Sequence, residues 1–231
     1  MNTDRLYGVG EPLIQRQRDH GIDAVKALDL VKALGCNAYR SWMDLSIVLK
    51  DPVTPDPEAV KEYTALLNRA KELDIEVTSM SGEWFLPEGC KQRKGYGMPK
   101  RDLTEGSLYM QALMMLEESW CTMAGLFPQV DIWEVGNEWN LNIFLHPDGF
   151  LNTPGMKPYS ADEKMDIAVD MMYYSAKGIR RSGSKARIAS FSPALSTPGL
   201  GGDMPGQAFV RDKYKVKANV KQSIFFLIET V

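Results

Sequence analysis

The segment Asp131-Ile-Trp-Glu-Val-Gly-Asn-Glu-Trp-Asn140 contains the strongest structural and functional signal in this chain. Its apolar first half predicts a short buried strand, and the pair Asn137-Glu138 follows directly where that strand ends. In parallel β/α folds, functional groups collect at the carboxyl ends of the strands. Asn137 and Glu138 are therefore the first candidates for a functional site. A salt-bridged glutamate with a purely structural role is the alternative.

Short apolar runs and amphipathic segments alternate along the rest of the chain. Strands are predicted at residues 6–10, 36–42, 75–80, 132–135 and 187–191, and helices at 22–34, 57–73, from Thr104 to about 120, and 160–183. This alternation predicts a parallel sheet with helices outside it. The segments after the strands are long and those before them are short. That asymmetry is typical of a (β/α) barrel with its site at the carboxyl ends of the strands.

The spacing of the strands indicates an incomplete barrel. Eight β/α units at the observed spacing need about 360 residues, whereas the chain has 231. We expect one domain over residues 1–231, containing about five to six units of a (β/α)8 TIM barrel. A smaller doubly wound sheet is the alternative fold. Open sheet edges in an incomplete barrel would favour self-association, helped by the apolar run at residues 224–228.

Two motifs resemble those of the clan A retaining glycoside hydrolases. The run Trp133-Glu-Val-Gly-Asn-Glu138 resembles their W-E-x-x-N-E motif at the end of the fourth strand, and Arg40 matches an arginine at the end of their second strand. The resemblance covers residues 6–195 and implies hydrolysis of an O-glycosyl bond by double displacement. It implies that Glu138 is the general acid/base and that Asn137 binds the hydroxyl next to the reacting carbon. It also implies that Arg40 keeps the nucleophilic carboxylate ionised, a role that suits a permanently charged, forked guanidinium.

The nucleophile is the gap in this resemblance. Retaining hydrolysis needs two carboxyl groups about 5–5.5 Å apart, and the family places the second on a glutamate that ends the seventh strand. Glu229 ends a late strand-like run here, but by count that run is the sixth strand. Glu134 is expected to lie deeper than Glu138, in a structural role. We therefore expect little or no hydrolase activity from this chain. A non-catalytic carbohydrate-binding remnant and an unrelated α/β enzyme with Glu138 as a simple base are the alternatives.

Aromatic and acidic side chains after the predicted strands are candidates for sugar contacts. The aromatic residues are Trp42, Trp84, Phe85, Tyr96, Trp139 and Phe144. Sugar rings stack their apolar C–H faces on aromatic planes, so Trp84 and Trp139, which follow strands directly, are the preferred substrate-binding pair. Packing within loops is the alternative for each. Asp44 and Glu83 could hydrogen-bond sugar hydroxyls, and solvated loop carboxylates are the alternative for both.

Composition and charge argue against several other functions. The net charge of −3 gives no reason to expect nucleic acid, and the sequence contains no apolar run of membrane-spanning length. Three cysteines and two histidines are too few for a disulfide framework or a histidine-rich metal site, so no metal or other cofactor is expected. The first residues do not resemble a signal peptide, which favours a cytoplasmic location. The expected partner is an oligo- or polysaccharide, either β-linked or arabinosyl.

Overall fold

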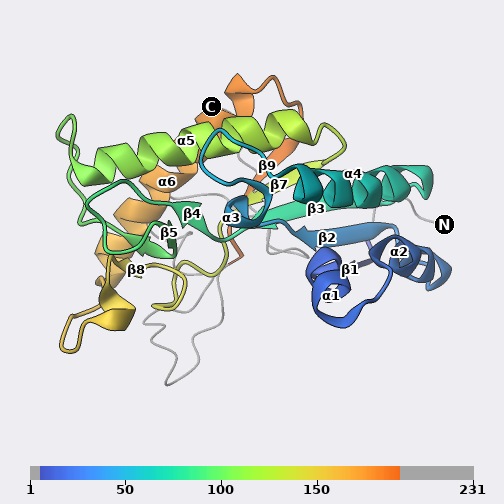
Figure 1. The fold of residues 1–231 in the computed structure, drawn as a ribbon, viewed down its shortest axis with the longest axis horizontal. Helices are drawn as coiled ribbons and strands as arrows, with labels where there is room; N and C mark the ends of the chain where they lie inside the picture. The colour runs from blue at the N-terminus through green and yellow to red at the C-terminus, as the bar shows by residue number, and fades with distance from the viewer. Residues whose placement is uncertain (1–5, 193–231) are drawn as a thin grey trace.

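A single parallel sheet organises the computed structural model, which describes residues 6–192 (Figure 1). Its strands, in spatial order, are β1 (Gly8–Gly10), β2 (Ala38–Trp42), β3 (Glu76–Ser81), β7 (Ile132–Val135) and β9 (Arg187–Ser190). Each strand pairs with the next one along the chain, and all four pairings are parallel. A doubly wound sheet reverses its strand order at one point, and the five described strands do not.

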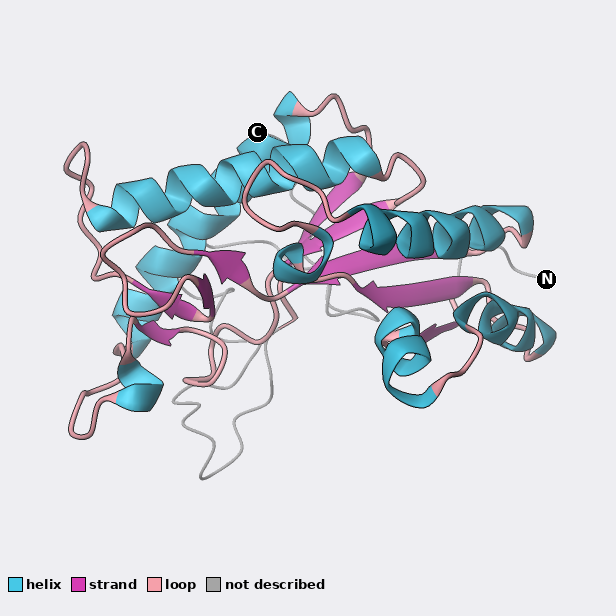
Figure 2. Ribbon diagram, in the orientation of Figure 1, coloured by secondary structure: helices cyan, strands magenta, loops and turns pink. Residues whose placement is uncertain are grey.

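Helices connect these strands and cover the sheet (Figure 2). They are α1 (Leu13–His20), α2 (Ala24–Ala33), α3 (Leu45–Val48), α4 (Pro57–Glu72), α5 (Leu108–Leu126), α6 (Ala161–Arg181) and the 3-10 helix η1 (Phe150–Asn152). The capping residues predict two of the starts correctly: Asp56 caps α4, and Ser160 forms a capping box with Glu163 at α6. Among residues 6–192, no helix is long and apolar enough to cross a membrane.

Three features differ from the sequence prediction. Helix α5 is capped by Ser107 rather than Thr104, because Gly106 has a left-handed backbone (φ 79°) that interrupts the helix before Ser107. The helices α1, α3 and η1 were not predicted. The long segments after β3 and β7 contain short strands: β4 (Trp84–Phe85) pairs with β5 (Lys94–Gly95), and β6 (Gly97–Met98) pairs with β8 (His146–Pro147).

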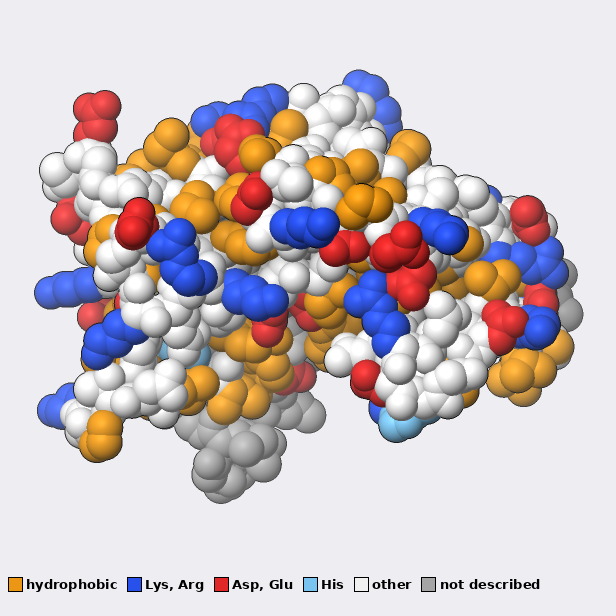
Figure 3. Space-filling model, in the orientation of Figure 1, with side chains coloured by type: hydrophobic (Ala, Val, Ile, Leu, Met, Phe, Trp, Pro, Cys, Tyr) orange, Lys and Arg blue, Asp and Glu red, His pale blue; other side chains and the backbone are white. Residues whose placement is uncertain are grey.

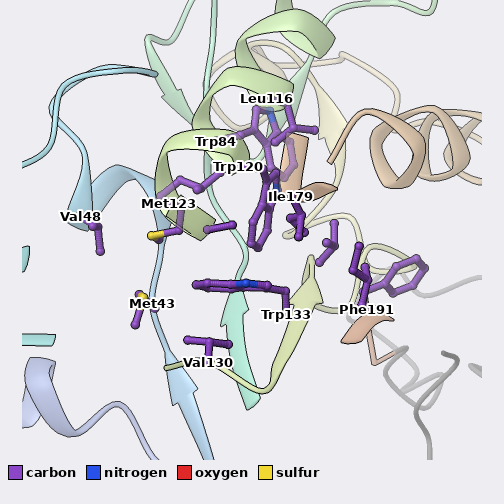
Figure 4. Close-up of a cluster of buried hydrophobic side chains, with 14 of the residues drawn as sticks. Met43, Val48, Trp84, Leu116, Trp120, Met123, Val130, Trp133, Ile179 and Phe191 are labelled. Carbon is purple, nitrogen blue, oxygen red and sulfur yellow. The ribbon is translucent and has the colours of Figure 1, made fainter. Parts of the chain in front are cut away.

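The two faces of the sheet carry different side chains. On the helix-covered face, Trp133 packs edge-on against Trp120 of α5, with ring centroids 5.6 Å apart, inside the apolar cluster drawn in Figure 4. The opposite face corresponds to the inside of a barrel and carries two ion pairs. Arg187 binds Glu76 at 2.7 Å, and Arg40 binds Glu134 at 2.6 Å. On the molecular surface, Figure 3 shows side chains of both charges interspersed with apolar ones.

Close packing between α5 and α6 depends on Gly178. A Cβ at this position would lie 2.2 Å from the carbonyl oxygen of Glu117 and 3.2 Å from the amide nitrogen of Cys121. Nearby, the buried carboxylate of Glu117 binds both Lys177 and Arg181 of α6 at 2.9 Å. The absence of a side chain at Gly178 therefore lets the two helix backbones approach each other.

We predict that Gly178→Ala destabilises the protein by about 2–3 kcal/mol, because the added methyl group must push the two helices apart. Gly125→Ala in α5 is the matched control, since the nearest atom to its new Cβ is 3.9 Å away. That change should be neutral, or stabilise α5 by less than about 1 kcal/mol. Urea unfolding of both variants tests this, and equal effects would contradict the close approach at Gly178.

Candidate functional site

Glu138 lies in a tight turn directly after β7. Gly136 has a φ of 85°, and a Cβ there would lie 2.3 Å from the indole ring of Trp139. Glu138 itself has a φ of 47°, an uncommon conformation for a residue with a side chain and one that is concentrated at functional sites. Its backbone N–H donates to the carbonyl oxygen of Ser192, which follows β9, at 3.2 Å. The turn is therefore held by the neighbouring strand.

The carboxyl group of Glu138 is half-buried beside Arg40. Burial raises the pKa of Glu138 above its ordinary value, because the charged form loses hydration. The positive charge of Arg40 acts in the opposite direction and has the smaller effect. The balance favours the protonated carboxyl group more than in water, which is the property that a general acid needs.

Arg40 forms a bidentate ion pair with Glu134. Its Nε donates to Oε2 at 2.6 Å and its Nη2 donates to Oε1 at 3.0 Å. Glu134 is fully buried, and its Oε1 also accepts from the backbone N–H of Ser192 at 3.3 Å. The guanidinium carbon lies 5.3 Å from the centre of the Trp42 ring. Among the described residues, the carboxylate that Arg40 binds is therefore Glu134.

Asn137 packs against the turn that follows β3 and is buried. A Cβ at Gly82 in that turn would lie 3.5 Å from the Cβ of Asn137 and 3.3 Å from the ring of Tyr96. This close fit brings the carboxyl ends of β3 and β7 together. Asn137 therefore lies at the same edge of the sheet as Glu138.

Asp44 stabilises the turn after β3 through hydrogen bonds to its backbone. Its Oδ1 accepts backbone N–H groups from Gly82 at 2.7 Å and from Glu83 at 3.2 Å. Burial raises the pKa of Asp44 to about 6, and the two N–H donors oppose that shift. Glu83 in turn accepts a hydrogen bond from the hydroxyl of Ser46. Asp44 is buried, so the alternative that it is a solvated loop carboxylate is wrong. Sugar contact by Asp44 or Glu83 stays a prediction.

Trp84 and Trp139 are core residues in this structure. Each is 1% exposed, and their rings meet edge to face with centroids 6.1 Å apart. The indole N–H of Trp84 donates to the carbonyl oxygen of Gly97 at 2.9 Å, and Trp139 packs on Phe191. Neither indole presents a face to a ligand, which corrects the expectation that they stack on sugars. The physical reason is that the long segments after β3 and β7 pack against each other, as the β6–β8 pairing also shows.

The charge of Arg40 acts on Glu138, and Asn137 directly precedes Glu138 in the turn after β7. The roles expected for these three residues stay predictions. Glu229 lies outside the described residues. Sequence reasoning missed Ser192, which carries no motif. Within residues 6–192, His, Cys, Asp and Glu side chains form no group of three or more that could hold a metal ion.

A hollow of about 880 Å³ lies elsewhere, between β8 and the start of α6. Its lining residues are Pro99, Lys100, Leu108, Pro147, Asp148, Met156, Lys157, Pro158, Tyr159, Ser160 and Glu163. Arg40, Asn137 and Glu138 do not line it. We therefore place the candidate site at the strand ends, next to the half-buried carboxyl group of Glu138, and not in this hollow.

Comparison with known proteins gives a clear answer for the fold. No protein-family model and no curated protein sequence matches the chain. Among solved structures, it is similar to a broad-specificity GH5-4 endoglucanase from Clostridium longisporum, with a TM-score of 0.55 and 14% identity over 87% of this chain and 56% of that one. It is also similar to a GH5_18 variant from Streptomyces cattleya in complex with Manβ1-4GlcNAc, with a TM-score of 0.50 and 20% identity over 80% and 44%.

A third similar structure is the exo-β-1,4-mannosidase Op5Man5 from Opitutaceae bacterium strain TAV5, with a TM-score of 0.50 and 15% identity over 78% of this chain and 30% of that one. The chain thus spans between 30% and 56% of the lengths of these three structures. All three are glycoside hydrolases with TIM-barrel folds. The described residues have the fold of part of such a barrel, which confirms the predicted fold class and the resemblance at the level of the fold.

We predict that Trp84→Ala costs about 3–5 kcal/mol in the free energy of unfolding, because it removes a large buried side chain. Trp42→Ala should cost less, since Trp42 is only partly buried. Urea unfolding monitored by circular dichroism compares the two. A loss below about 1 kcal/mol for Trp84→Ala would contradict its place in the core.

The pKa of Asp44 predicts how Asp44→Asn changes stability with pH. The folded value of about 6 exceeds the ordinary 3.8, so the native state binds the proton more tightly than the unfolded state. Stability from this group is therefore fully present below about pH 4 and is lost as the pH rises through 6. Two pKa units correspond to roughly 3 kcal/mol.

Asp44→Asn removes this loss, so the variant should gain stability over the parent by roughly 2–3 kcal/mol between pH 4 and pH 7.5. Urea unfolding at both pH values measures the difference. Asp44→Ala, which lacks the acceptor for Gly82 and Glu83, should be less stable than the parent at both. An Asp44→Asn difference that does not change with pH would rule out the raised pKa.

Proposed function

We propose that this chain carries the acid/base half of a retaining glycoside hydrolase site. Glu138 protonates the oxygen of the leaving group and later activates water. Asn137 binds the hydroxyl next to the reacting carbon. Arg40 faces the position where a nucleophilic carboxylate attacks the anomeric carbon from the opposite side. The substrate is an oligo- or polysaccharide.

One observation carries this proposal: Glu138 is a half-buried carboxyl group at the end of a barrel strand, in a backbone conformation that the neighbouring strand holds. Carboxyl ends of barrel strands are where TIM-barrel enzymes place their catalytic groups. The direction of its pKa shift suits an acid. The fold that it shares with glycoside hydrolases adds support at the level of architecture.

A second function is a non-catalytic carbohydrate-binding protein. It is favoured because, among the described residues, the other carboxylates near this edge of the sheet are already bound by neighbouring residues. Glu134 is bound by Arg40, and Asp44 and Glu83 accept hydrogen bonds from neighbouring residues. Without a carboxylate to attack the anomeric carbon, the double displacement cannot begin.

Azide distinguishes these functions because it can replace a missing nucleophile. Azide attacks the anomeric carbon, the bond to the aryl oxygen breaks, and that oxygen takes the proton of Glu138. The product is a glycosyl azide of inverted configuration. A carbohydrate-binding protein would bind saccharides in a calorimetric titration and give no glycosyl azide.

We predict little turnover of 4-nitrophenyl and 2,4-dinitrophenyl β-glycosides by the chain alone, and turnover once azide is added. Glu138→Gln should reduce the azide-dependent rate 10²–10⁴-fold for 4-nitrophenyl glycosides, the range for loss of a general acid. The loss should be much smaller for the dinitrophenyl glycosides, whose leaving group needs no proton. Activity with a poor leaving group should also fall as the pH rises through the raised pKa of Glu138.

Asp148→Asn is the control variant, because Asp148 lines the separate hollow. It should leave the azide-dependent rate unchanged. Glu138-dependent turnover without azide would place the nucleophile within this chain and make Glu229 the candidate. An azide-dependent rate that Glu138→Gln does not alter would refute the acid/base assignment.

A further inference from the structure

Glu134 is a fully buried carboxylate on β7, four residues before Glu138, which lies in the turn after that strand. Both of its oxygens are bound by Arg40 of β2, at 2.6 and 3.0 Å. The backbone N–H of Ser192 donates to one of them at 3.3 Å. This one side chain of β7 thus links its strand to β2 and to the residue pair that follows β9.

This network ends at the backbone of Glu138. The carbonyl oxygen of Ser192 accepts the N–H of Glu138 at 3.2 Å. The backbone of Ser192 is therefore bound at its N–H by Glu134 and at its carbonyl oxygen by Glu138. Glu138 has a left-handed backbone with a φ of 47°. A conformation of this kind persists only where its surroundings determine it. The path from Glu134 through Ser192 supplies such a constraint.

The same contacts control the charge that Glu138 experiences. Within the described residues, Arg40 is the charged side chain whose field acts on Glu138, and it opposes the effect of burial. An arginine without a counter-charge would act more strongly, particularly where water is excluded. The carboxylate of Glu134 supplies that counter-charge from the inside of the sheet.

We propose that Glu134 is the positioning residue for Glu138: through Ser192 it fixes the turn that carries Glu138, and by pairing with Arg40 it shields Glu138 from the guanidinium charge. This inference rests on the proposed function for its catalytic meaning. Its physical content concerns the titration and the backbone of Glu138, which can be measured without any substrate.

The test is a titration of the Glu138 carboxyl group by carbon-13 NMR, assigned with Glu138→Gln. Glu134→Gln leaves the charge of Arg40 uncompensated, so the pKa of Glu138 should fall by about one unit. Hydrogen exchange at the backbone N–H of Glu138 should become faster in the same variant. The double variant Arg40→Met/Glu134→Gln removes both charges and should bring the pKa back to the parent value or above.

Glu76→Gln is the matched control. Glu76 forms the other ion pair on this face of the sheet, with Arg187 at 2.7 Å, and its change removes a more exposed ion pair away from Glu138. If Glu134 only stabilises the fold, the pKa of Glu138 in folded Glu134→Gln should stay at the parent value, as in Glu76→Gln. On our proposal, Glu76→Gln leaves both the pKa and the hydrogen exchange of Glu138 unchanged.

Should Glu134→Gln fail to fold, Glu134→Asp tests the same inference. It keeps the charge but withdraws the carboxylate from Ser192 and Arg40, so it should accelerate exchange at Glu138 and lower its pKa by a smaller amount. An unchanged Glu138 pKa in the folded Glu134 variants, or an equal shift in Glu76→Gln, would overturn the proposal. A failed azide experiment would instead count against the glycosidase function, and the two failures are therefore distinguishable.

Discussion

The partly exposed Arg40 and the fully buried Glu134 form an ion pair between β2 and β7, and the arrangement of the candidate site depends on it. Placing two charges inside a protein costs hydration energy, which only good geometry and further hydrogen bonds offset. Here Arg40 binds Glu134 in a bidentate contact, and the backbone N–H of Ser192 is a third hydrogen-bond donor to the same carboxylate. Loss of either partner would leave an uncompensated charge in the interior, so the pair fixes the relative positions of three strand ends.

The sheet can hold such a pair because its two faces have different environments. Trp133 and its neighbours on one face pack against the helices, so that face is apolar and stabilises the fold by removing hydrocarbon from water. The other face corresponds to the inside of a barrel and carries the charged pairs Arg40–Glu134 and Arg187–Glu76. Stability is therefore supplied mainly from the helix side, and polar chemistry is concentrated on the opposite side.

The loops after β3 and β7 complete the site by packing inward. Trp84 and Trp139 meet each other in the core, while Asp44 holds the turn at Gly82 on which Asn137 rests. These loops thus fix the position of Asn137 and the turn before Glu138. Trp84 and Trp139, the aromatic residues expected from the sequence to stack on sugars, instead pack in the core beneath the site.

The residues alone allowed prediction of the five strands of the parallel sheet, of helices α2, α4, α5 and α6, of the capped starts of α4 and α6, and of the place of Asn137 and Glu138 directly after β7. These follow from local periodicity and from strand polarity, which neighbouring residues encode. Arg40 was expected at the end of β2 and lies in its middle. The folded structure was needed to show that Arg40 binds Glu134, that the carbonyl oxygen of Ser192 accepts the N–H of Glu138, that Asp44 is buried and that Trp84 and Trp139 are core residues. Each of these depends on contacts between segments 30 or more residues apart or on how loops fold over the sheet, and neither leaves a periodic signal in the sequence.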